Sequence, residues 1–346
     1  RGIPRPYGQG HMVGRLVTTT VARLAVISPQ PDATAFKSMV KYWVSADSTG
    51  SIFDYDTRLK PPLHSICLVQ AIMDSPVAAR GAIAGNYQFP AMDRIVHKRA
   101  SFTFAIAQSS RFISNYESIN AENLHGWYTG SGMTYLYNAD AGHYQNDFWP
   151  TADMHRLPGT TIDNRPLADS EYAGTRGQAI VGGVTLGQDG MACMAFAEYG
   201  GELTGKKAWF MFGDRILCLG TDITSTSTHA VETIIENRNV GDANAPYPVV
   251  ISEKTWRHIA GTGGYVFHEG AAKSLSEQRT GKCVGINNRP SSPTDPRTRK
   301  YVTLWLDHGI AAQAARYAYT LLPGATPAET KTYAGAPTVQ VIANTA

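Results

Sequence analysis

The sequence is poor in charge, and it has no long apolar run. Only 17% of the 346 residues are Asp, Glu, Lys or Arg, and the formal net charge is +3. No cluster of Lys and Arg resembles a nucleic-acid-binding tail, and no apolar stretch approaches the length of a membrane span. We therefore expect neither a nucleic acid nor a membrane among the partners.

Patterns that bind metals are also missing. No CxxC pair occurs, which excludes a zinc signature of paired cysteines, and disulfide pairing cannot be deduced from the spacing. We interpret the four cysteines as buried free thiols. The nearest candidates for ligands fit neither a dedicated metal site nor a calcium loop. We predict no metal and no cofactor for these residues: Cys67, Cys193, Cys218, Cys283, His125, His143, His155, Asp140, Asp147 and Asp153.

The length suffices for about two or three domains. The 33 Gly and 19 Pro are typical of an all-β or mixed soluble protein with many turns. The sequence begins at Arg1, without an initiator Met or a signal peptide. We therefore expect a fragment or a processed product whose targeting signal has been lost.

Three helices are predicted near the beginning. Apolar residues recur at helical spacing over residues 10–27 and 63–73, and Pro31 and Asp32 open another helix between them. Short loops join the three helices, so residues 1–80 are predicted to be the end of an all-α domain.

From about residue 84, short segments of alternating apolar and polar residues follow, separated by Gly, Asn, Asp and Ser. They predict a large antiparallel β-sandwich over residues 81–324, and hence an α+β multidomain chain. Residues 325–346 are predicted to lead into a further small β domain. The predicted strands cover 102–106, 133–137, 178–185, 191–197, 208–212, 216–219, 231–235, 249–252, 264–267, 301–306, 316–321 and the segment from 331 on.

Residues 114–163 gather the groups that a carbohydrate needs from a protein. Sugar hydroxyls bind carboxylates and amides, and the C–H face of a pyranose packs on an aromatic ring. This segment contains Glu117, Asn120, Glu122, Asn123, Trp127, Tyr128, Tyr135, Tyr137, Tyr144 and Trp149.

A resemblance to polysaccharide lyase family 8 is carried by NYESINAEN, GWYTGSGMTYLYN, HYQNDFWPT and RLPGTT, and by KKAWFMFGDRILCLGTDI, THAVETIIENR and YAYTLLPGAT. The family holds the bacterial hyaluronate, chondroitin AC and xanthan lyases. The resemblance implies that residues 1–80 end an (α/α) toroid and that the β-sandwich is the central domain of the family.

The resemblance also implies β-elimination at a uronic acid. A base removes the C5 proton and the O4 substituent leaves, so donors and cations must stabilise the charge that develops on the carboxylate. In the family a Tyr is the base, and an Asn and a His neutralise the carboxylate. Their motifs precede RGIPR, so we expect this chain alone to turn over little or nothing. The expected partners are an acidic polysaccharide and the N-terminal helical portion of the same enzyme.

Four residues of this sequence match catalytic motifs of the family. RGIPRPYGQGH places Arg1 and Arg5 on two arginines that face the cleft, although Pro4 replaces a more usual small polar residue. Glu117 and Asn120 match the family's Glu-x-x-Asn. The resemblance implies that the arginines hold the leaving oxygen, the catalytic Tyr hydroxyl or the sugar anions. It further implies that Glu117 orients that Tyr or a His and one arginine, and that Asn120 binds the sugar near the scissile oxygen.

Each of these residues also has a structural interpretation. Without the resemblance, Arg1 and Arg5 are two solvated arginines near a chain end. Likewise, Glu117 is a surface residue and Asn120 a loop cap.

Further candidates for substrate binding follow in the sequence. They are Asn123 and Glu122, which are weaker candidates of the same type as Glu117 and Asn120, and the aromatic residues Trp127 and Tyr128. Trp127, Tyr128 and Trp149 are large enough to stack on a sugar ring. Large aromatic residues pack in cores more often, however, and we prefer that interpretation.

The sequence thus predicts a secreted bacterial polysaccharide lyase of the hyaluronate or chondroitin AC type, which leaves a 4,5-unsaturated uronate. Two alternatives remain open. A xanthan lyase shares most of the motifs, and a catalytically silent carbohydrate-binding β module would also explain why the expected base is missing.

Overall fold

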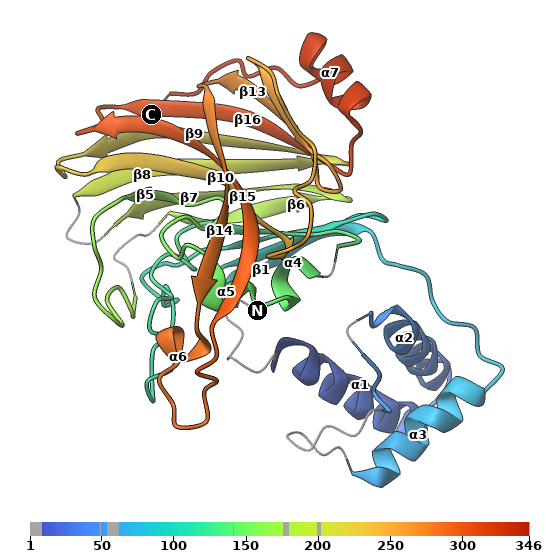
Figure 1. Ribbon diagram of the computed structural model, residues 1–346. Coiled ribbons are helices and arrows are strands. Elements are labelled where there is room, and N and C mark those ends of the chain that lie inside the picture. Colours follow the sequence, from blue (N-terminus) through green and yellow to red (C-terminus); the bar gives the residue numbers. More distant parts are fainter. Residues whose placement is uncertain are drawn as a thin grey trace. The chain divides into compact units, whose positions relative to one another are not determined.

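The computed structural model describes residues 9–48, 50–53, 62–140, 142–175, 180–198 and 202–345. The chain divides into two compact units, and the division falls between Ile83 and Ala84 (Figure 1). The sequence placed this boundary between residues 80 and 81. Each unit has its own apolar core.

The described part of the smaller unit forms three helices, α1 (Gln9–Ile27), α2 (Asp32–Ala46) and α3 (Leu63–Asp74), which confirms the predicted helices. Arg15 Nε donates a hydrogen bond of 2.8 Å to Asp47 Oδ2 and so links α1 to the end of α2. None of the described helices is long and apolar enough to cross a membrane. The core of this unit consists of Val21, Ala22, Ala25, Val40, Ile52, Val69 and Ile72.

The described residues of the larger unit form three sheets whose paired strands are all antiparallel (Figure 1). The first sheet has the order β1 (Gly85–Phe89), β2 (Arg94–Lys98), β3 (Thr103–Ala107), β4 (Met133–Tyr137). The second has the order β14 (Ala272–Gly281), β15 (Arg297–Ile310), β10 (Ala230–Asp242), β5 (Thr161–Asp163). The third has eight strands in the order β11 (Val250–Ser252), β12 (Trp256–Ile259), β13 (Gly263–Glu269), β16 (Ala315–Pro323), β9 (Arg215–Ser225), β8 (Leu203–Phe212), β7 (Asp189–Ala197), β6 (Val181–Leu186).

One apolar core joins the three sheets. Along β7 every second residue is buried, as expected for a strand with one face on a core. Phe104 of the first sheet, Leu304 of the second and Trp209 of the third belong to the same buried cluster. Figure 1 shows β14 and β15 running across the strands of the eight-stranded sheet. The predicted antiparallel sandwich is thereby confirmed.

The described helices of this unit are short: η1 (Pro90–Met92), α4 (Gly142–Gln145), α5 (Phe148–Thr151), α6 (Cys283–Ile286) and α7 (Pro327–Gly335). The strand predicted from residue 331 on is wrong, because residues 327–335 are helical and no strand lies in the described stretch 336–345. Thr326 and Glu329 form a capping box that starts α7. Whether residues 325–346 lead into a further domain stays a prediction.

The cysteines are free thiols that differ in exposure. Cys218 and Cys283 are buried, Cys193 is half-buried and Cys67 is exposed on α3. The prediction of buried thiols is therefore right for two of them and wrong for Cys67.

Lys207 of β8 places an amine inside the sandwich. Its side chain is 3% exposed. Its Nζ donates a hydrogen bond of 2.8 Å to the carbonyl of Gly159 and lies 4.9 Å from the centroid of the Phe196 ring. Burial lowers the pKa of Lys207 to about 7. An unfolded lysine has a pKa of about 10.4.

This difference predicts a pH dependence of stability. Between about pH 7 and pH 10 the unfolded chain binds a proton that folded Lys207 has released, so the free energy of unfolding rises with pH. This gain in the free energy of unfolding is lost as the pH falls to about 7. We expect Lys207→Met to flatten this rise in urea unfolding curves, and Lys206→Met, at an exposed neighbour, to leave it unchanged. Equal slopes in all three proteins would show that Lys207 titrates as an exposed lysine does.

Candidate functional site

The candidate site lies on the long connection between the neighbouring strands β3 and β4. Asn120, Ala121 and Asn123 have positive φ angles of 56°, 57° and 57°. Asn tolerates this left-handed conformation better than most residues other than Gly. Ile119 O accepts a hydrogen bond of 3.0 Å from Glu122 N, so residues 119–122 form a tight turn with Asn120 at its corner.

Asn115 holds the base of this connection. Its Nδ2 donates to Trp127 O and, at 3.4 Å, to Tyr172 O, while its Oδ1 accepts a hydrogen bond of 2.9 Å from Gly130 N. A Cβ on Gly130 would lie 2.4 Å from the carbonyl oxygen of Asn115, so only glycine fits there. The loop is therefore fixed on both sides of the segment that carries Glu117 and Asn120.

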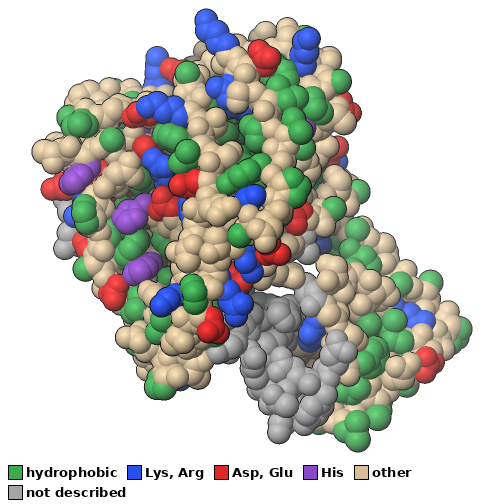
Figure 2. Space-filling view, in the orientation of Figure 1, with side chains coloured by type: hydrophobic (Ala, Val, Ile, Leu, Met, Phe, Trp, Pro, Cys, Tyr) green, Lys and Arg blue, Asp and Glu red, His purple; other side chains and the backbone are tan. Residues whose placement is uncertain are grey.

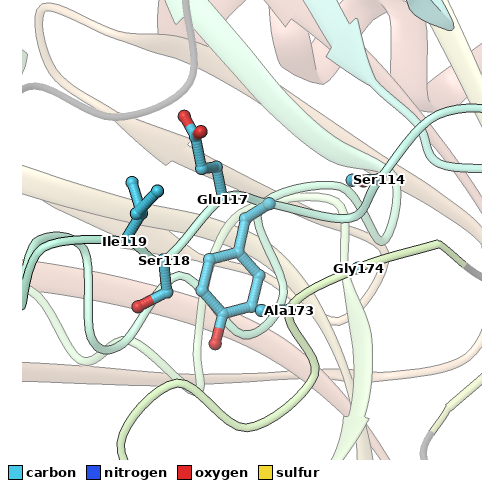
Figure 3. A pocket seen from close by; sticks show the side chains of 7 residues that line it. Ser114, Glu117, Ser118, Ile119, Ala173 and Gly174 are labelled. Carbon is cyan, nitrogen blue, oxygen red and sulfur yellow. The ribbon is translucent and has the colours of Figure 1, made fainter.

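Glu117 lines an open pocket of about 470 Å³ between residues 114–119 and residues 173–174 (Figure 3). In Figure 3 the Glu117 side chain points away from that of Ser118. Asn123 Nδ2 donates a hydrogen bond of 2.7 Å to the carbonyl oxygen of Glu117, which fixes its backbone. Glu117 and Asn120 are both exposed, so a carboxylate and an amide of the same loop face solvent. The pocket is lined by Ser114, Tyr116, Glu117, Ser118, Ile119, Ala173 and Gly174.

A second loop, distant in sequence, supports the first. It follows α6, and Asn287 Oδ1 accepts a hydrogen bond of 2.7 Å from Asn123 N. Leu124 N donates to Ile286 O at 2.8 Å, and Asn288 N donates to Ala121 O at 2.7 Å. This support was not predicted from the sequence, although the run GINNRP carries the Asn and Pro signals of a turn.

An ion pair completes the contact between the two loops. Glu122 is 7% exposed and pairs with the guanidinium of Arg289. Glu122, a weaker sequence candidate for substrate binding, is therefore occupied by a protein partner. The hydrogen bonds and this pair make the turn at residues 119–122 a rigid platform.

Asn287 provides a test of this support. Its side chain is fully buried, so Asn287→Ala leaves the amide of Asn123 without its acceptor, and we expect the free energy of unfolding to fall by about 1–3 kcal/mol. Asn288→Ala is the matched control, because exposed Asn288 bonds through its backbone. Equal melting temperatures for the two variants would contradict the role of Asn287.

The aromatic candidates do not face solvent. Trp127 is 5% exposed, and its Nε1 donates a hydrogen bond of 2.9 Å to Ala168 O. Its ring stacks on His125 at a centroid distance of 4.4 Å. Tyr128 has no exposed surface, and burial raises its pKa far above the usual range. The prediction that Trp127 and Tyr128 bind a sugar is therefore corrected. Both residues pack in the interior, as the alternative interpretation of large aromatic residues predicted.

Asn123 is half-buried, and its side-chain nitrogen and backbone nitrogen both donate to the protein. These bonds give Asn123 a positioning role for Glu117. A contact of its remaining side-chain oxygen with the substrate stays a prediction.

The histidines near the site have protein partners. His125 Nε2 lies 2.9 Å from Asp169 Oδ1, and His155 Nε2 donates to Arg165 O at 3.2 Å. His143 Nδ1 accepts from Asn239 N at 3.0 Å, and burial lowers the pKa of His143 well below its usual value. In the ranges that the structure describes, no group of three His, Cys, Asp or Glu could hold a metal ion.

Arg1 and Arg5, the other two candidates, lie outside the described residues. Their predicted place opposite Glu117 and Asn120 therefore stays a prediction. The described residues supply the acid, the amide and the pocket, all within the larger unit.

Known proteins resemble this chain in sequence and in fold. The model of the super-sandwich domain of polysaccharide lyase family 8 matches residues 84–334. The chain is 39% identical over 368 residues to a xanthan lyase of Bacillus sp. strain GL1, with 100% of this chain and 39% of that protein covered. It is 35% identical over 366 residues to a hyaluronate lyase of Thermasporomyces composti, with 100% of this chain and 46% of that protein covered. The chain thus spans less than half the length of these relatives.

A solved structure is also similar. The Streptomyces coelicolor A3 chondroitin AC lyase in complex with chondroitin sulphate superposes with a TM-score of 0.90 at 34% identity, and 97% of this chain and 45% of that chain are covered. Sequence and fold agree over the sandwich that carries Glu117 and Asn120. The resemblance found in the sequence is confirmed: this chain belongs to polysaccharide lyase family 8.

Proposed function

We propose that the protein containing this chain is a secreted bacterial lyase that cleaves chondroitin or hyaluronan by β-elimination. The observation that carries this proposal is the rigid, exposed loop that presents Glu117 and Asn120 beside an open pocket, in a sandwich of this family. The helices of residues 9–74 would be the last ones of an (α/α) toroid, and the N-terminal portion of that toroid would complete the site.

The chemistry requires stabilisation of negative charge. Removing the C5 proton next to an ionised carboxylate places a second negative charge on the same group of atoms, so fixed donors and cations must meet it. In our proposal an upstream Tyr is the base. Glu117 orients both this Tyr and one arginine. Asn120 donates to the sugar near the leaving O4, while Arg1 and Arg5 hold that oxygen or the sugar anions.

Local charges matter more here than the field of the whole chain. Figure 2 shows Lys and Arg interspersed with Asp and Glu on the visible face of the larger unit. The net charge of +3 is small for a chain of this length. An acidic polymer would therefore be recognised by individual guanidinium groups and hydrogen-bond donors beside the pocket.

A xanthan lyase is the second candidate. The 39% identity to the Bacillus xanthan lyase favours it, while the 35% identity to the hyaluronate lyase and the structural match to the chondroitin AC lyase favour a glycosaminoglycan. These differences in identity are too small to choose a polymer. Both candidates leave a C4=C5 double bond, so one assay compares them.

The test uses the complete natural protein with chondroitin sulfate, hyaluronan and xanthan as separate substrates. Rising ultraviolet absorbance from the C4=C5 double bond identifies a lyase, and the polymer that is cut fastest gives the specificity. Retention on a polymer without absorbance would overturn the proposal in favour of a carbohydrate-binding module. Cleavage of xanthan alone would support the proposed β-elimination, and xanthan would then replace chondroitin or hyaluronan as the proposed substrate.

A further inference from the structure

Phe112 is an exposed aromatic side chain near the candidate site. It is 75% exposed, more than any other Phe, Tyr or Trp in the part of the chain that the structure describes. A single exposed apolar side chain is common on protein surfaces, so whether this ring marks a binding surface depends on the groups around it.

The backbone under Phe112 is well ordered by hydrogen bonds. Ser110 Oγ accepts from Phe112 N at 3.1 Å and from Ile113 N at 3.2 Å, while Ser110 N donates to Ile113 O at 3.0 Å. Gln108 anchors the start of this turn, because its Nε2 donates to Cys193 O at 2.8 Å. The turn therefore holds the ring outward from a fixed base.

A cation accompanies the ring. The guanidinium carbon of Arg111 lies 4.6 Å from the centroid of Phe112, which is the geometry of a cation–π contact. Arg111 is itself exposed. A flat apolar surface and a guanidinium side by side match the two features of a uronic acid unit, its C–H face and its carboxylate.

This pair lies next to the pocket. Phe112 precedes the pocket residue Ser114 by two positions, a span of at most about 7 Å along the chain. Ser114 forms a β-bridge with Thr175, and Asn115 N donates to Gly174 O at 2.8 Å, so this rim of the pocket is fixed. A polymer held in the pocket would therefore pass within reach of the ring.

We infer that Phe112 and Arg111 form a subsite that binds a sugar unit of the acidic polysaccharide beyond the unit that reacts. The ring stacks on the pyranose face and the guanidinium binds the carboxylate or a sulfate. This inference rests on the proposed function, because it takes the same polymer as ligand. It concerns binding alone and leaves the chemical step to the residues of the pocket.

The subsite predicts a difference between long and short substrates. In the complete protein we expect Phe112→Ala and Arg111→Ala each to raise KM for the polymer about fivefold without changing kcat. With the shortest oligosaccharide that is cleaved, we expect both constants to stay at the wild-type values. The loss from Arg111→Ala should shrink with added salt, because screening weakens the charge contact in the wild-type protein.

Phe212→Ala is the matched control. Phe212 is 41% exposed and pairs in register with Arg215, so it too is an exposed ring near an arginine. It lies near the β2–β3 turn, because Arg99 Nε contacts Asp214 at 3.1 Å, whereas residues 108–113 leave the opposite end of β3. We expect this variant to keep the wild-type KM on the polymer.

Binding is measured separately by the retardation of each protein in gels that contain chondroitin sulfate, hyaluronan or xanthan. Weaker retardation of Phe112→Ala than of Phe212→Ala supports the subsite, even if the protein proves inactive and the proposed function fails. Equal retardation and equal KM for these two variants would overturn the subsite while the lyase activity stands. Absence of retardation of the wild-type protein in all three gels would overturn it as well.

Discussion

Replacing Glu117 by Gln in the complete protein is expected to lower kcat about 10²–10³-fold, in the range seen when one preorganised group of a charged transition state is removed. Stability should change little. The described loop holds Glu117 through its carbonyl oxygen, so the substitution removes none of the hydrogen bonds that fix the turn. The initial rate of double-bond formation and the melting temperature are measured on the same preparation.

The matched control is Glu253→Gln. Glu253 is exposed and lies in the turn between β11 and β12, where its backbone nitrogen donates to Trp256 O at 2.9 Å. We expect its kcat to stay within about twofold of the wild type, as for an ordinary surface substitution. If Glu117→Gln and Glu253→Gln have the same kcat, Glu117 is not part of the active site. A parallel fall of melting temperature and kcat for Glu117→Gln would instead indicate a structural role.

Asn120 needs a substitution that respects its backbone. Its φ of 56° would strain an alanine, so Asn120→Gly removes the side chain and keeps the turn. We expect kcat of this variant to fall about as far as that of Glu117→Gln, with a melting temperature near that of the wild type. An unchanged kcat in this variant would remove Asn120 from the active site.

The regular elements could be predicted from the sequence because their signals are local. The alternation in β7 and the apolar spacing in α1 arise within a few residues and need no knowledge of partners. The start of α7 has an equally local signal, since Thr326, Pro327 and Glu329 form a capping box, but the strand predicted from residue 331 on overlaps the second half of this helix.

The site could be predicted only in part. Glu117 and Asn120 were found through their motif, and the structure places both on one exposed loop. The bond between Asn123 and Asn287 joins residues 164 positions apart, and no local pattern specifies such a contact. Burial of Trp127 and Tyr128 depends likewise on distant segments, such as the carbonyl of Ala168 that binds the indole. Composition alone therefore could not separate a stacking platform from a core.

The free energy of unfolding is expected to fall by about 3–5 kcal/mol on Arg238→Met, the cost of leaving one charge of a buried ion pair alone. Arg238 of β10 is 2% exposed, and its Nη2 donates to Glu236 Oε2 at 2.9 Å. Tyr265 OH donates to the same oxygen at 2.8 Å. Without the guanidinium, the Glu236 carboxylate stays buried with one donor fewer and no opposite charge. Urea unfolding of both proteins measures the difference.

A double variant and an exposed pair separate charge from packing. Arg238→Met/Glu236→Gln removes the orphaned charge, so we expect it to regain part of the lost stability. Lys206→Met breaks an exposed ion pair, because the side chains of Lys206 and Asp222 are 48% and 43% exposed. We expect this variant to lower the free energy of unfolding by at most about 1 kcal/mol. An equal decrease in the free energy of unfolding for Lys206→Met and Arg238→Met would show that the buried ion pair of Arg238 stabilises the protein no more than an exposed pair does.

The position of this ion pair explains why its loss should destabilise the whole larger unit. Glu236 and Arg238 belong to the second sheet, Tyr265 to the third, and Arg238 Nη1 donates to Leu136 O of the first at 3.3 Å. One carboxylate and one guanidinium thus connect all three sheets inside the core. Because β4, which contains Leu136, ends the connection that carries Glu117 and Asn120, a loosened junction should also make that loop more mobile. Faster amide hydrogen exchange in residues 115–130 of Arg238→Met than of Lys206→Met would demonstrate this coupling, and equal exchange would confine the junction to global stability.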